Sequence, residues 1–213
     1  MFKKGVIIKT NNLRAGLKVN WDYKLIIYFT LFLSGVIIGV LLIKNAGEDF
    51  NRFFCDLLVN HVNAKKNNSF LTDFCFALLC LVLLFFINYL CSLSAVGFPF
   101  IWLLLTGFGV WCGAVTSEFL ISFGLKGLGF CLLVQVPCYA ITAATLVCCC
   151  CEGTKICNNI FFYLFGNCGF DTSKGLLLKE YTLKYALMCS PLILGALLSS
   201  VCFKMFSGFF TFV

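Results

Sequence analysis

Long apolar runs alternate with short polar stretches along this chain, and five of the runs contain about 20 residues each. At 1.5 Å per residue, a helix of that length crosses the roughly 30 Å hydrocarbon core of a bilayer. The runs lack the two-residue alternation that marks a membrane β-barrel. The pattern therefore predicts about five transmembrane helices, over residues 25–43, 70–93, 99–120, 129–151 and 185–206.

The composition also indicates a membrane protein. The chain is 61% hydrophobic and 12% charged, whereas a typical soluble domain is about 25% charged. A soluble protein of 213 residues could not bury so much apolar surface. The first run is too long for a signal peptide, and no small-residue cleavage site follows it. We expect an all-α integral membrane protein, with a basic cytoplasmic segment over residues 1–24 and one multi-spanning domain over residues 25–213.

Lysine and arginine residues favour one side of the predicted bundle. Ten precede the first span or lie between the fourth and fifth: Lys3, Lys4, Lys9, Arg14, Lys18, Lys24, Lys155, Lys174, Lys179 and Lys184. Six fall on the other side: Lys44, Arg52, Lys65, Lys66, Lys126 and Lys204. The richer side is expected to be cytoplasmic. This rule predicts a cell-membrane protein with its N-terminus inside and its C-terminus outside.

Glycine and proline residues interrupt the apolar pattern between the second and third spans. Gly97 and Pro99 fit a tight turn followed by the first turn of a helix, where the missing proline N–H costs little. Gly107 follows within the same glycine-rich stretch. We favour a hairpin turn here, and a break that binds a ligand is the alternative.

Two Gly-x-x-x-Gly pairs occur within spans. Gly35 and Gly39 lie in the first span, and Gly109 and Gly113 lie in the third. Small residues at this spacing allow helix backbones to approach closely in lipid. We therefore expect all four glycines to lie in helix–helix contacts.

A few polar residues fall within or beside the spans. Glu118 is predicted about 12 Å from the bilayer midplane, which favours a carboxylate that snorkels to the interface. The alternative is an ion pair between Glu118 and Lys204. In the fourth span Pro137 is expected to kink the helix, and Gln135 could hydrogen-bond a neighbouring span. These polar residues favour a role in helix packing, and a polar pathway through the membrane is the less favoured interpretation.

The loop after the first span carries an amphipathic pattern. Over residues 48–60 its apolar residues recur at helical spacing, opposite a polar face that includes Asp49, Arg52 and Asp56. The polar segment NAKKNNS is expected to end this helix. It could lie on the leaflet, pack on the bundle or meet an extracytoplasmic protein, and the three charged residues are the candidate partner surface.

The sequence offers little for catalysis. His61 is the one histidine, and no motif for a serine nucleophile, phosphate loop or dinucleotide site is present. The run Cys148–Cys151 lacks the paired spacing of zinc ligands, and cysteine in an apolar span behaves as a small hydrophobe. We expect no catalytic or metal-ligating residues, no cofactor and no nucleic-acid partner. The lipid bilayer is the expected surroundings.

The order of these parts resembles the stage II sporulation protein M family of endospore-forming bacteria. The resemblance rests on GVIIGVLLI in the first span, NRFF in the outer helix, GFPFIWLLLTGFGVWCGAVTSEFL after the turn, and GLKGLGFCLLVQVPCYAITAATL leading into the fourth span. The cysteine-rich fourth span and the long segment 152–183 depart from the family pattern.

The resemblance implies a scaffold that catalyses nothing. Members of the family recruit peptidoglycan hydrolases, the stage II sporulation proteins P and D, to the septal membrane of the mother cell for forespore engulfment. The competing interpretation is a small transporter or permease subunit that uses Glu118, Gln135, Pro137 and Lys204. A cavity that reaches mid-membrane and is lined by those side chains would favour the transporter.

The charge distribution predicts that the two ends of the chain lie on opposite sides of the membrane. Reporter fusions after Val19 and after Val213 should report the cytoplasm and the exterior, respectively. Two cytoplasmic reporters would require an even number of spans and would contradict the assignment.

Overall fold

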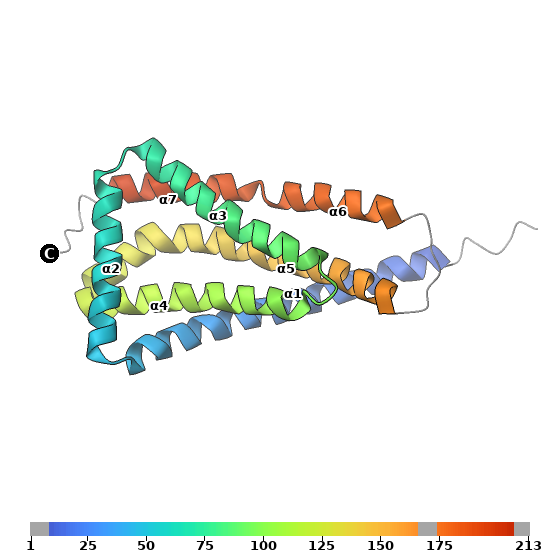
Figure 1. The fold of residues 1–213 in the computed structure, drawn as a ribbon, viewed down its shortest axis with the longest axis horizontal. Coiled ribbons are helices and arrows are strands. Elements are labelled where there is room, and N and C mark those ends of the chain that lie inside the picture. Colours follow the sequence, from blue (N-terminus) through green and yellow to red (C-terminus); the bar gives the residue numbers. More distant parts are fainter. Residues whose placement is uncertain (1–8, 166–173, 207–213) are drawn as a thin grey trace, which may run out of the picture.

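The computed structural model describes residues 9–165 and 174–206. Within these residues the regular structure is helical (Figure 1). The elements are α1 (Lys9–Asn45), α2 (Glu48–Asn67), α3 (Phe70–Leu93), α4 (Phe98–Phe130), the π-helical segment η1 (Cys131–Gln135), α5 (Val136–Phe165), α6 (Lys174–Met188) and α7 (Pro191–Phe206). The predicted all-α bundle with an outer amphipathic helix is confirmed.

Within the described residues, four helical segments are long and apolar enough to cross a bilayer: Tyr23–Asn45, Phe70–Leu93, Phe98–Phe161 and Lys179–Phe206. The third reverses direction at Gly124, whose φ of 56° lies in the left-handed region that glycine tolerates. It therefore supplies two antiparallel passes, which makes five passes within the described ranges (Figure 1). Because five is odd, α1 begins at one end of the bundle and α7 ends at the other.

The two Gly-x-x-x-Gly pairs lie face to face in the contact between α1 and α4. A Cβ added to Gly35 would clash with the Thr106 carbonyl oxygen, and one added to Gly39 with that of Val110. From the other helix, an added Cβ on Gly109 would lie 2.5 Å from the Phe32 oxygen. An added Cβ on Gly113 would likewise clash with the Val36 carbonyl oxygen. The helix backbones therefore touch along two turns. Gly107 lies outside this contact, because an added Cβ there would meet nothing within 4 Å.

The turn between α3 and α4 has the compact form expected of it. The Gly97 N–H donates to the Ser94 carbonyl at 3.1 Å, and the Gly97 carbonyl accepts from the Ile101 N–H at 3.0 Å. A Cβ at Gly97 would overlap the Cys91 carbonyl, so only glycine fits. Pro99 occupies the first turn of α4.

Several helix boundaries differ from the sequence expectation, including the start of α1 at Lys9 and the end of α4 at Phe130. α2 continues to Asn67 instead of ending near residue 60, because the alanine and lysines of NAKKNNS are good helix formers. α5 continues to Phe165, beyond the predicted end at residue 151. The last span is divided into α6 and α7 at Pro191, which has no N–H to donate and disfavours helix in the residue before it.

The helix just before Pro137 departs from regular α-helical geometry, whereas the sequence predicted a kink at this proline. The Val136 N–H bonds to the Cys131 carbonyl five residues back, which gives the π-helical turn η1 just before the proline. Single π-helical turns of this kind occur often at functional sites. Here the turn precedes the start of α5 and includes Gln135.

The α1–α4 contact predicts a strong position dependence for leucine substitutions. Gly113→Leu should lower the free energy of unfolding by about 2 kcal/mol or more, because the side chain would force two backbones apart. Gly107→Leu should leave it unchanged or raise it, because leucine is the better helix former. Thermal unfolding of the purified proteins in detergent measures the difference. Equal losses in the two variants would contradict the packing described.

Candidate functional site

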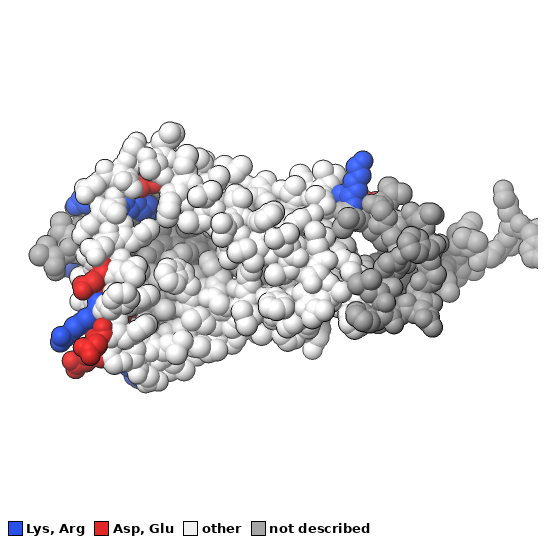
Figure 2. Space-filling model, viewed as in Figure 1, with Lys and Arg blue, Asp and Glu red and all other residues white. Residues whose placement is uncertain are grey.

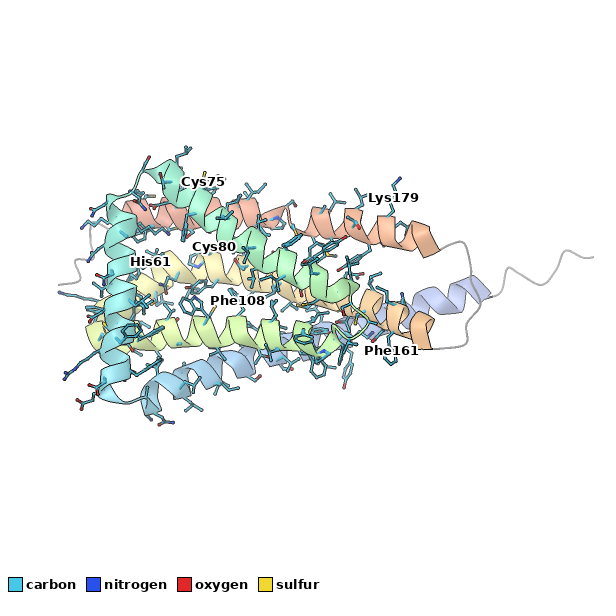
Figure 3. The ribbon with its side chains drawn as sticks, in the orientation of Figure 1. His61, Cys75, Cys80, Phe108, Phe161 and Lys179 are labelled. Atoms are coloured by element: carbon cyan, nitrogen blue, oxygen red, sulfur yellow. The ribbon has the colours of Figure 1, made fainter. Side chains whose placement is uncertain are left out.

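A cavity of about 580 Å³ lies where α2 crosses the end of the bundle. Side chains from α2, α3, α4, η1, α5 and α7 form its wall, and Figure 3 labels His61 of α2 and Cys80 of α3 on its border. The volume falls within the range of about 300–1,000 Å³ that is usual for small-ligand sites. Most of the lining is apolar, and its polar members include His61, Lys65, Asp73, Gln135 and Ser199.

The cavity exists because α3 and α4 diverge. The turn at residues 94–97 holds these helices together at one end, and they separate toward α2 (Figure 1). Figure 2 shows a hollow on this face of the molecule, beside the charged end. Phe76 of α3 and Trp111 of α4 line the cavity and remain 56% and 48% exposed. Since both helices belong to membrane spans, this side of the cavity faces hydrocarbon.

Two lysines seat α2 on the bundle. Lys65 Nζ donates to Ser199 Oγ at 3.4 Å and lies 4.7 Å from the centre of the Phe203 ring. Lys204 Nζ, from α7, donates to the carbonyl oxygens of Lys66 at 3.4 Å and Asn68 at 2.5 Å. The second lysine thus satisfies carbonyls at the C-terminal end of α2 that have no partner within the helix.

Asp73 is a buried carboxylate in the first turn of α3, and it is 3% exposed. Its Oδ2 lies 3.9 Å from Lys204 Nζ, and among the described residues this atom has no hydrogen bond. A buried carboxylate with one distant cation is under-satisfied, since such groups normally accept several hydrogen bonds. Asp73 therefore has accepting capacity that faces the cavity.

Burial changes the acid–base behaviour of α2 at the cavity. It lowers the pKa of His61 below its ordinary value of 6.5, and the Lys65 cation lowers this pKa further while Asp73 opposes the change. The pKa of Lys65 is also lowered, first by burial, with Asp73 and Cys138 acting in the opposite direction. His61 is consequently neutral near pH 7.

Gln135 reaches the cavity from the π-helical turn. Its Oε1 is buried and has no hydrogen-bond partner among the described residues, although the sequence suggested a bond to a neighbouring span. Pro137 follows two residues later but does not line the cavity. Gln135 is the residue that the cavity shares with the predicted polar pathway.

Glu118 and Lys204 occupy separate surroundings. Glu118 is 2% exposed and accepts a hydrogen bond from Ser122 Oγ at 2.8 Å. The expected snorkelling is therefore wrong: the carboxylate is buried against the bundle. Among the described residues no ion pair joins Glu118 to Lys204, which faces Asp73 instead. Neither residue lines the cavity.

Sequence reasoning missed most of the polar lining. It placed His61 in an outer loop and treated Lys65 as part of a polar segment beyond the helix. One signal was available, because His61 and Lys65 share a helical face with the buried Leu58 and Val62. Asp73 and Ser199 gave no comparable signal, because their contacts come from distant helices.

The cysteine run belongs to the core at the opposite half of the bundle. Cys149, Cys150 and Cys151 are fully buried, whereas Cys148 is half-buried. Cys150 Sγ donates to Asn88 Oδ1 at 3.5 Å, and Asn88 Nδ2 donates to the Tyr185 hydroxyl at 3.1 Å. Within the described ranges no three His, Cys, Asp or Glu side chains are grouped closely enough to hold a metal ion.

The outward face of α2 is charged and open. Asp49 and Asp56 are exposed, and Arg52 forms an exposed pair with Glu48 at 3.7 Å. Figure 2 shows charged side chains gathered at the end of the molecule that α2 covers, beside a long uncharged middle. The candidate partner surface is thus accessible, although exposed pairs of this kind contribute little to stability.

No protein-family model, curated protein or solved structure matches the chain.

The lowered pKa of His61 predicts a titration midpoint below pH 6.5. Because the folded state favours the neutral ring, its contribution to stability is present above the unfolded pKa and is lost as the pH falls through the folded pKa. Lys65→Gln should raise the midpoint and Asp73→Asn should lower it further. Lys66→Gln, one residue along the helix, should leave it unchanged. Histidine NMR resolves this, and a midpoint unmoved by Lys65→Gln would contradict the arrangement.

Proposed function

We propose that this protein is a non-enzymatic membrane scaffold that presents α2 to a protein partner outside the membrane. The observation that carries the proposal is the position of α2, which lies across one end of the bundle with its charged face exposed (Figure 1). Lys65 and Lys204 hold the helix to α7 and so fix its orientation. A helix seated in this way offers a pre-organised surface, which lowers the entropic cost of binding.

The resemblance to the stage II sporulation protein M family supplies the proposed partners. In this proposal, α2 recruits the stage II sporulation proteins P and D to the septal membrane during engulfment. The excess of lysine and arginine at the N-terminal side supports an orientation in which α2 lies outside, where these hydrolases act.

Charge reversal on α2 tests the scaffold. Arg52→Glu combined with Asp56→Lys should reduce hydrolase copurification about tenfold while protein abundance stays constant, because exposed substitutions rarely affect stability. The matched control reverses Lys179 and Glu180, an exposed pair at the far end of the bundle (Figure 3). Pull-down from sporulating cells measures the effect. Undiminished copurification with the α2 variant would overturn the proposal.

A transporter is the second candidate, and the cavity favours it. The cavity extends from α2 to the π-helical turn and includes Gln135. It lacks Glu118, Pro137 and Lys204, the other members of the predicted pathway. Gln135→Leu separates the two functions: a scaffold retains hydrolase recruitment and engulfment, whereas a transporter loses activity at unchanged abundance.

A further inference from the structure

Lys65 is the cavity cation that has no carboxylate within ion-pair distance among the described residues. Lys204 is compensated by Asp73 and by two backbone carbonyls. Within the described part of the chain, the groups in direct contact with Lys65 are the neutral Ser199 Oγ and Phe203 ring, and the Asp73 charge acts on Lys65 from beyond ion-pair distance. With His61 neutral near pH 7, the two cations Lys65 and Lys204 and the one carboxylate Asp73 leave one net positive charge at this end of the bundle, which an anion would balance.

The rest of the cavity is suited to hydrocarbon and to hydroxyl groups. Trp111, Phe130, Val134 and Phe203 supply apolar wall. Gln135 Oε1 and Asp73 Oδ2 are buried acceptors without a hydrogen bond among the described residues. Buried acceptors of this kind are normally satisfied, so a ligand that donates hydroxyl hydrogens would remove a cost.

The side on which the cavity is open restricts the class of ligand further. The cavity opens between α3 and α4, next to the end of the bundle that α2 crosses (Figure 2). This side of the molecule faces hydrocarbon. A ligand can therefore enter from the bilayer without crossing water. A lipid in the leaflet nearest α2 would have its headgroup at the depth of this helix and an acyl chain against the apolar wall.

We propose that this cavity binds an anionic phospholipid with a hydroxyl-bearing headgroup from the surrounding leaflet. Lys65 pairs with the phosphate, the hydroxyl groups donate to Asp73 and Gln135, and an acyl chain leaves through the opening between Phe76 and Trp111. The lipid would then lie beneath α2 and help to hold it on the bundle. This proposal stands apart from the scaffold function, because it needs no protein partner.

Native mass spectrometry of the purified full chain in detergent tests the site. Phosphatidylglycerol should be retained about tenfold more than phosphatidylcholine, because both lipids carry a phosphate but only phosphatidylglycerol has hydroxyl groups that donate to the Asp73 carboxylate, and one such charge-assisted hydrogen bond accounts for that factor. Lys65→Gln should lower the retention of phosphatidylglycerol about tenfold, because the phosphate loses its charged partner, and Lys65→Arg should restore this retention. Lys66→Gln removes the same charge one residue away from the lining and should keep it. Equal retention of the two lipids, or equal behaviour of Lys65→Gln and Lys66→Gln, would overturn the proposal.

A second matched pair tests the apolar part without touching a charge. Cys80 and Cys75 are both exposed cysteines of α3, but only Cys80 lines the cavity (Figure 3). Cys80→Phe should block the binding of phosphatidylglycerol, and Cys75→Phe should not. This comparison remains informative if the Lys65→Gln variant fails to fold. Equal binding by these two variants would refute the site. Glycerol phosphate, which has no acyl chain, should fail to displace the lipid, and displacement would instead indicate a site for a soluble anion.

Discussion

Helices in a bilayer must associate without the hydrophobic effect, because lipid tails are as apolar as the side chains that they touch. In this protein the contact between α1 and α4 meets that constraint with four glycines whose Cα atoms face carbonyl oxygens of the opposite helix. Close approach of this kind gains dispersion and weak Cα–H···O interactions along two turns. The remaining helices are positioned from this pair, since α3 joins α4 through the turn at Gly97 and α5 returns from α4 at Gly124.

The divergence of α3 from α4 has to be compensated at the end where these helices separate. α2 covers that end, and its inner face combines apolar residues with Lys65 and His61. Lys204 bonds to carbonyls beyond the last turn of α2 and approaches Asp73 of α3. One lysine thus connects three helices. The way α2 crosses the end of the bundle thus accounts for the cavity, the exposed charged face and the buried Asp73 carboxylate.

Local patterns predicted the spans and the glycine contacts, whereas the cavity depends on long-range geometry. The bounds of α3 match the expected residues because serines flank a continuous apolar run. Hydropathy placed Glu118 and Lys204 at similar depth but carried no information on which neighbour each one faces. The break at Pro191 divides a span whose sequence is apolar on both sides of the proline. The hydropathy pattern therefore gave no sign of the division into α6 and α7. The angle between α3 and α4, which opens the cavity, follows from packing against α5 and α7 and has no local signal.

The positive φ at Gly124 has a consequence for biogenesis. It joins two long apolar helices with almost no intervening loop, and Lys126 is the one charged residue between Glu118 and Glu152. Carrying one lysine through the hydrocarbon costs about 3 kcal/mol on insertion scales, which two apolar helices readily offset. Because the connection is short and an apolar helix left in water is costly, the two helices are suited to insert together as a helical hairpin during synthesis.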